Sequence, residues 1–270
     1  MNNPLEIKRT PPLKMMAPLI VFAIIALMWS AYWYVALGKA KQKLAAFEAG
    51  YVSLNCGDRS WGGYPFRVHF DCAGLETNFE GLDITAGKLW LIGQAWNPDH
   101  VIGALFGPVH IKGVAISGEP IRFSYRTGNG KLELASLLAE KQSISFAAGK
   151  ILAVEKTETH VRAATNSKRL DLAITLSGLS TGTAQLDSFS INGTLDRMMP
   201  REGSFEILSE PSEYLDAIWI VQHLARLGDA EMNAAQAVIT PLLKANNNKL
   251  PIQLKDRIWY WGPFAVTKSE

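Results

Sequence analysis

Residues 15–37 read MMAPLIVFAIIALMWSAYWYVAL and carry no charged side chain. At about 1.5 Å per residue, a helix of this length extends about 34 Å, which is enough to cross a hydrocarbon core of about 30 Å. Trp29, Tyr32, Trp33 and Tyr34 gather toward its C-terminal end, and such rings favour the membrane–water interface. The stretch therefore predicts a transmembrane helix that ends at a headgroup layer.

Two other interpretations of this stretch stay open. A cleaved signal peptide has an apolar run of only about 7–15 residues, and here bulky aromatic side chains precede the small residues at Ala36–Leu37–Gly38. A buried core helix is the second alternative, which the length and the aromatic belt disfavour. We expect an uncleaved anchor.

The orientation of the anchor is not given by its flanking charges. Lysines flank it on both sides, so the positive-inside rule gives almost no bias. The N-terminal position of the anchor and a pair of cysteines favour export of the C-terminal domain, which predicts a single-pass protein of the bacterial inner membrane. The expected segments are a cytoplasmic N-terminus (1–14), the transmembrane helix (15–37), a helical stem that ends at Gly50 (38–50) and a β-rich periplasmic domain (51–270).

Period-two alternation of apolar and polar residues dominates the chain after Tyr51. Short alternating segments without long helices between them favour antiparallel pairing. We expect a mainly β fold with one or two helices, in which a curved antiparallel sheet follows the anchor. Strands are predicted around residues 66–71, 88–92, 121–126, 143–146, 170–176, 188–191 and 250–267, and a helix is predicted over 211–227.

The two cysteines are Cys56 and Cys72. Their spacing suits adjacent antiparallel strands joined by a loop that contains Trp61 and two glycines. In an oxidising compartment they would form a disulfide, which for a loop of this size contributes roughly 3 kcal/mol. Two buried free thiols are the alternative.

Residues able to carry catalysis are sparse. The five histidines are scattered, and no zinc-binding His pair, nucleophile elbow or phosphate loop occurs. Asn97–Pro98–Asp99–His100 reads as a turn rather than a metal site. The net charge of +2 without a basic block argues against nucleic acid as a partner. We expect no catalytic residue, metal or cofactor, and no enzymatic activity.

An aromatic string, Trp61-Gly-Gly-Tyr-Pro-Phe-Arg67, stands next to the cysteines. Gly63 permits a sharp turn, and Pro65 restricts Tyr64 to an extended backbone. One interpretation is a rigid hairpin capped by aromatic side chains. The other is a rim that faces lipid or membrane, formed by Trp61 and Tyr64, and the same two interpretations apply to Trp259 and Trp261 near the C-terminus.

The string Gly63–Tyr64–Pro65–Phe66–Arg67 between Cys56 and Cys72, together with Gln94–Ala95–Trp96–Asn97–Pro98 downstream, resembles the DUF2125 family of alphaproteobacterial membrane-anchored proteins. The resemblance covers most of the chain and implies an envelope protein with a β-rich periplasmic domain. It implies no activity. A weaker resemblance at the level of the fold is to AsmA-like proteins, whose curved sheets are associated with outer-membrane lipids.

Three functions remain after these observations. The first is lipid binding in a groove of the curved sheet, with the bilayer bound through residues 15–37. The second is a structural module that scaffolds other envelope proteins and exposes an apolar patch or a bare sheet edge. An envelope enzyme is the least favoured.

Overall fold

The computed structural model describes residues 12–50, 52–79, 82–128, 131–146, 151–163, 169–180, 185–195, 203–209, 249–255, 258–261 and 264–266. The predicted helix over 211–227 lies outside the described residues. The elements are α1 (Pro12–Gly50), β1 (Val52–Gly62), β2 (Arg67–Phe79), β3 (Leu82–Gln94), β4 (Asn97–Phe106), β5 (Val109–Ile111), β6 (Val114–Ser117), β7 (Ile121–Gly128), β8 (Lys131–Ser145), β9 (Ile151–Ala163), β10 (Leu170–Ser180), β11 (Gln185–Leu195), β12 (Gly203–Ser209), β13 (Lys249–Lys255), β14 (Ile258–Trp261) and β15 (Phe264–Val266).

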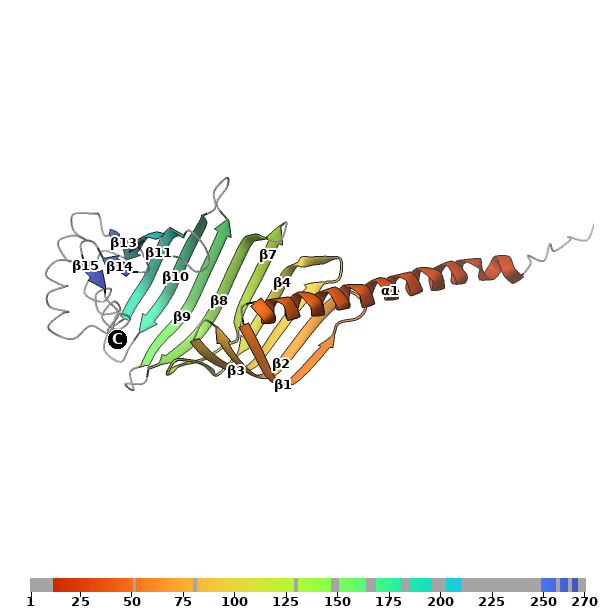
Figure 1. Ribbon diagram of the computed structural model, residues 1–270, viewed down its shortest axis with the longest axis horizontal. Helices are drawn as coiled ribbons and strands as arrows, with labels where there is room; N and C mark the ends of the chain where they lie inside the picture. The colour runs from red at the N-terminus through yellow and green to blue at the C-terminus, as the bar shows by residue number, and fades with distance from the viewer. Residues whose placement is uncertain are drawn as a thin grey trace, which may run out of the picture.

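A single helix of 39 residues, α1, covers both the predicted transmembrane segment and the predicted stem, and it ends at Gly50 as expected. It is long and apolar enough to cross a membrane. Figure 1 shows its first half projecting away from the sheet, while its second half lies against the first strands. The side chains of residues 16–28 are all exposed, because no described residue packs against this part of the helix.

All fifteen described strands belong to one antiparallel sheet, which confirms the predicted fold class. Successive strand units pair with one another along the chain, so the sheet is a meander. β4 and β5 together form one interrupted strand, and β6 and β7 form the next, since β5 pairs β3 and β6 while β6 also pairs β8. Lys112 and Gly113, both at positive φ, make the two-residue turn between β5 and β6.

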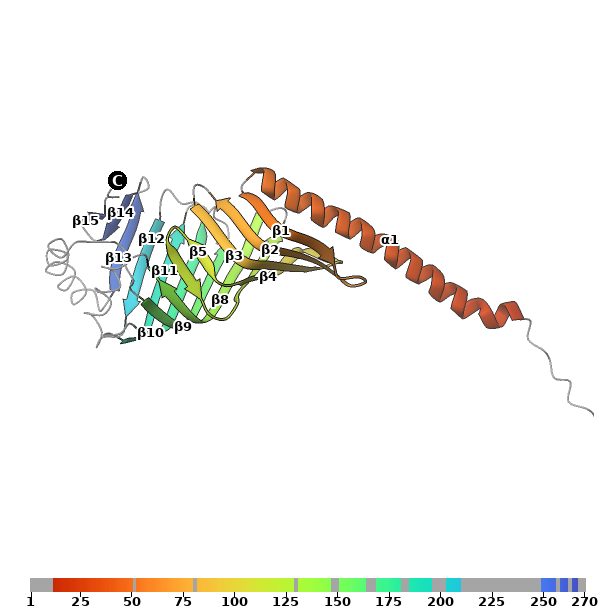
Figure 2. The same cartoon turned by 90° about the horizontal axis from the view of Figure 1, so that it is seen from below.

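A continuous line of irregular pairing crosses the sheet, and we call it the crease. At one level of the meander, the pairing between neighbouring strands from β1 to β11 skips a pair of residues, while the register is the same on both sides of the gap. Several crease residues have positive φ, including Lys141 at 51° and Gly178 at 61°. Figures 1 and 2 show that the sheet is curved. A line of interrupted pairing with residues at positive φ is a place where the strands can bend. The crease residues are Gly57, Gly74, Gly87, Gly107, Glu119, Lys141, Glu155, Gly178 and Asp187.

The predicted disulfide between Cys56 and Cys72 is present and joins β1 to β2 diagonally across the crease. The two Cα atoms lie 5.2 Å apart. Cys72 is fully buried in a cluster with Phe70 and Leu75, against which Leu44 of α1 packs. The crosslink therefore ties the edge strand to the part of the sheet that the helix covers.

Candidate functional site

Two turns at the same end of the sheet, formed by residues 63–67 and 95–96, contact α1. We call these two turns the clasp. The first turn joins β1 to β2 and closes with a hydrogen bond from the Arg67 N–H to the Gly63 carbonyl over 2.9 Å. The second joins β3 to β4. The Ala95 N–H donates to the Phe66 carbonyl over 3.1 Å and so links the two turns.

Side chains of the helix donate hydrogen bonds to backbone carbonyls of the clasp. The indole N–H of Trp29 donates to the carbonyl of Pro65 over 2.9 Å. The Tyr32 hydroxyl donates to the carbonyl of Ala95 over 3.1 Å. These bonds join residues far apart in sequence, and they fix the rotation of the helix relative to the sheet.

Trp33 is the centre of this contact. Its indole N–H donates to the Arg67 carbonyl over 2.7 Å. The side chain is only 5% exposed and packs with Val68 and Ala95. Its ring meets that of Tyr64 edge to face, with centroids 5.4 Å apart. Edge-to-face pairs of this kind add about 0.5–1.5 kcal/mol beyond burial.

Aromatic rings of both turns surround Trp29. The ring centroid of Phe66 is 6.0 Å from that of Trp29, and the ring centroid of Trp96 is 6.5 Å away. The hydroxyl groups of Ser30 and Tyr64 are hydrogen-bonded over 2.8 Å. The helix and the two turns therefore form a joint aromatic collar around residues 29–33.

Each residue of the string from Gly63 to Arg67 contributes to the clasp. Gly63 has a φ of 102°, and a Cβ there would collide with the Arg67 carbonyl, so only glycine fits the turn. Tyr64 and Phe66 contribute rings. Pro65 and Arg67 contribute carbonyl acceptors.

The residues predicted as a membrane rim are not all together. Trp61 is half-buried and packs on Phe70, with ring centroids 4.8 Å apart, so it belongs to the core beside the clasp. Trp259 and Trp261 pair within β13–β15, and their side chains lie outside the described part of the chain. Sequence reasoning missed the donor role of Trp29, Tyr32 and Trp33, although it placed these rings at the interface.

The predicted turn at Asn97–Pro98–Asp99–His100 is wrong, because these residues begin β4. The turn lies just before them, at Ala95 and Trp96. Proline is tolerated near the start of a strand, where it removes no central ladder bond. Among the described residues, no cluster of three His, Cys, Asp or Glu side chains could hold a metal ion.

A second feature begins at the clasp, namely the face of the sheet that carries Val68 and Phe70, which we call the apolar face. Directly opposed residues share a face, so the register can be followed from strand to strand. One row crosses the sheet with mainly apolar residues from β2 to β11, and Gly103 leaves room in it for the Phe123 ring. The row is Phe70, Leu91, Gly103, Phe123, Leu137, Thr159, Ile174 and Ile191.

Burial shows which side of the crease is concave. Residues of the apolar face that flank the crease are buried, such as Leu75, Val109, Val154 and Leu179 at 2–3% exposure. Most crease residues themselves are exposed. A sheet bent with its apolar face inward gives this pattern, because the two halves of each strand then close on one another.

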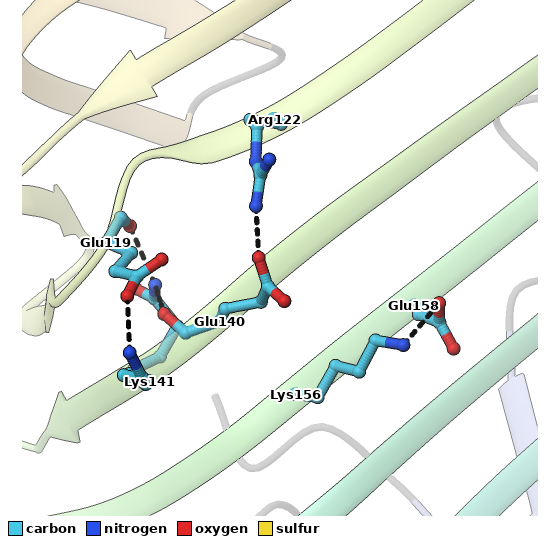
Figure 3. Close-up of polar contacts among 7 residues, drawn as sticks. Glu119, Arg122, Glu140, Lys141, Lys156 and Glu158 are labelled. Carbon is cyan, nitrogen blue, oxygen red and sulfur yellow. Dashed lines mark hydrogen bonds and ion pairs between the residues drawn. The ribbon is translucent and has the colours of Figure 1, made fainter.

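The opposite face is polar and carries ion pairs between neighbouring strands. Figure 3 shows Lys141 donating to the Glu119 carboxylate over 2.8 Å, and Arg122 paired with Glu140. The hydrogen bond from Lys141 lowers the pKa of Glu119 and raises that of Lys141. These groups are solvent-exposed, so the shifts describe a hydrated surface rather than a catalytic pocket.

The sequence matches one protein-family model over residues 33–205, described as "Uncharacterized protein conserved in bacteria (DUF2125)". The matched region begins at Trp33 and contains both turns of the clasp, the disulfide and the apolar face as far as β11. No curated protein and no solved structure matches the chain. Because the match covers more than half of the chain, this protein belongs to the DUF2125 family.

Proposed function

We propose that this protein is anchored in the bacterial inner membrane by α1 and binds lipid acyl chains on the apolar face of a periplasmic sheet. The observation that carries the proposal is the mainly apolar row on the concave side of a single sheet. Apolar surface that remains accessible is costly in water, at roughly 25 cal/mol per Å². A ligand with a long hydrocarbon chain would cover it.

The middle of the apolar face is the part best suited to a ligand. On β7–β10, Phe123, Leu137 and Ile174 are only partly buried. Within the residues that the structure describes, no second sheet or helix covers these strands. A sealed sandwich would have buried them against an opposing layer.

The first strands connect this face to the anchor. Val68 packs against Trp33 beside the clasp, and the cluster around Phe70 packs against Leu44 of α1. An acyl chain that leaves the bilayer beside the clasp would meet apolar side chains from the first strand onward. This geometry supports a binding role that requires no chemical step.

Two observations support export of the sheet. The disulfide between Cys56 and Cys72 is of the kind that persists in an oxidising compartment such as the periplasm. The only described helix is long and apolar enough for an anchor and lies near the N-terminus. The inner membrane is the bilayer that such an anchor would cross in a bacterium with two membranes.

The test uses the same substitution on neighbouring residues of β8. Leu137 lies on the apolar face opposite Phe123, and Leu138 lies on the polar face opposite Arg122. The full chain is purified in mild detergent as wild type, Leu137→Asp and Leu138→Asp, and lipid retained per protein is measured by mass spectrometry. We expect Leu137→Asp to lose most of the retained lipid and Leu138→Asp to keep it.

Circular dichroism and thermal unfolding check that both variants remain folded. Equal lipid in all three proteins would show that retained lipid belongs to the anchor alone, and the binding role would be abandoned in favour of a scaffold. Crosslinking of wild type in membranes with a phospholipid that carries a diazirine in its acyl chain gives an independent measure, which Leu137→Asp should reduce.

A further inference from the structure

The part of α1 that projects beyond the sheet is too short to cross the hydrocarbon core of a membrane by itself. Trp29 is the first described residue of α1 whose side chain is partly buried. The uncharged residues before it, 15–28, extend about 21 Å, whereas the hydrocarbon core is about 30 Å thick. About six further residues, up to Tyr34, are needed to cross it, and these are the residues that the clasp holds.

We propose that the clasp is immersed in the boundary between hydrocarbon and headgroups, where Tyr64, Phe66 and Trp96 insert among the lipids. This inference rests on the membrane anchoring proposed above, but it does not depend on lipid binding by the apolar face. It gives the turn at residues 63–67 a location rather than a reaction, because the two turns of the clasp would hold the sheet at the membrane surface.

The exposed side chains of the clasp are of the type that this layer favours. Tyr64 and Phe66 are each 56% exposed, and Trp96 is 53% exposed. All three belong to the aromatic collar, because their rings pack against Trp29 or Trp33 of the helix. Tyrosine and tryptophan rings concentrate at headgroup depth because they combine an apolar body with a polar end.

Backbone carbonyls of the clasp have hydrogen-bond partners within the protein, as a poorly hydrated environment requires. Irregular backbone near hydrocarbon is tolerated only where its polar groups find partners in the protein. The carbonyls of Pro65, Arg67 and Ala95 accept hydrogen bonds from side chains of α1, and the Phe66 carbonyl accepts one from a backbone N–H. Water is not needed to satisfy these four carbonyls.

Along the helix, charged residues begin directly beyond this level. Lys39 follows Trp33 by six residues, or about 9 Å along the helix. Lys41 lies over the Trp61 ring at 5.9 Å, and Lys43 pairs with Asp99 of β4 over 2.9 Å. Lysines at this height meet lipid phosphates, while the aromatic collar lies one layer deeper.

The experiment measures the depth of Trp96 by fluorescence. The full chain is reconstituted in vesicles of phosphatidylethanolamine and phosphatidylglycerol, with or without phosphatidylcholine brominated near the head end of its acyl chains. The contribution of Trp96 is the difference between wild type and Trp96→Phe. Trp90 lies in the middle of β3, away from the clasp, and Trp90→Phe provides the same difference for a tryptophan outside the membrane.

We expect bromolipid to quench the Trp96 contribution at least twofold and to leave the Trp90 contribution unchanged, with the opposite order for aqueous iodide. A Trp96 contribution that iodide quenches and bromolipid does not would overturn the proposal. Flotation of the vesicles after alkaline carbonate is measured in parallel. Protein that fails to float would refute the anchoring itself, whereas floating protein with a water-exposed Trp96 refutes only the immersed clasp.

Discussion

The indole N–H of Trp33 donates a hydrogen bond of 2.7 Å to the carbonyl of Arg67, and it thereby joins the apolar helix to the turn at residues 63–67. The ring that makes this bond is buried against Val68 and Ala95. One residue thus supplies both packing and polar pairing at the place where α1 meets the sheet. A substitution at Trp33 or Arg67 should therefore first destabilise the contact between α1 and the sheet.

Replacing Trp33 by Phe keeps an aromatic ring and removes the donor. The Arg67 carbonyl then loses its partner in a largely dry place, which costs about 1–3 kcal/mol. Thermal unfolding of the full chain in detergent should show the loss. Tyr34→Phe is the control, because Tyr34 is 66% exposed and its ring can stay where it is; an equal loss in both variants would mean that the hydrogen bond is not the cause.

Removal of the disulfide should weaken the edge of the sheet. The double substitution Cys56→Ala and Cys72→Ala avoids placing a polar group in the core and should lower the free energy of unfolding by about 3 kcal/mol. Denaturant unfolding measures this change. In intact cells, both thiols should resist alkylation until a reductant is added; free thiols before reduction would contradict an oxidising location.

The crease should tolerate changes unequally. Gly118 has a φ of 151°, and a Cβ there would overlap the carbonyl oxygen of Lys141. We expect Gly118→Ala to cost about 1–3 kcal/mol. Gly118 directly precedes the crease residue Glu119, whereas Gly57 lies on the crease itself. A Cβ at Gly57 would make only an ordinary contact, 3.5 Å from the Ala73 oxygen, so Gly57→Ala should stay within about 0.5 kcal/mol of wild type. Chemical unfolding compares the two, and equal costs would deny that the backbone conformation matters.

The ion pair between Lys141 and Glu119 should give the polar face a small dependence on pH. Its hydrogen bond lowers the pKa of Glu119 below the ordinary 4.5. A lowered carboxyl pKa stabilises the fold above the unfolded value, and this contribution disappears as the pH falls through the folded pKa. Lys141 has a raised pKa, so its contribution is present below the unfolded value and is lost as the pH rises through the folded one.

Lys141→Met removes this pair and keeps a Cβ at the same positive φ. We expect the thermal midpoint of the variant to fall below that of wild type at pH 7 by a small amount, because the groups are exposed. The difference should shrink as the pH falls through the folded pKa of Glu119, which lies below the ordinary value. A difference that persists at low pH would assign the effect to packing of the lysine stem instead.

Much of the strand pattern could be predicted from the sequence. Strands at 88–92, 121–126, 170–176 and 188–191 appear within β3, β7, β10 and β11, because period-two alternation is a local property. The turn beside Asn97 was misplaced, since asparagine and proline favour turns while the chain uses Ala95–Trp96 instead. The crease was not predicted: each irregular residue looks ordinary alone, and only the pairing of neighbouring strands aligns them.

The sequence by itself determined the apolar helix, the strand-rich class and the antiparallel pairing, because these depend on composition and periodicity. It also favoured the disulfide between Cys56 and Cys72, which the structure contains. The tertiary structure decided the clasp and the concave apolar face. The hydrogen bonds that hold α1 span 34 to 63 residues, and no local pattern reports which distant carbonyl an indole will meet. Likewise, the direction in which the sheet bends depends on how the interruptions in successive strands line up at the crease, and a single strand does not contain that information.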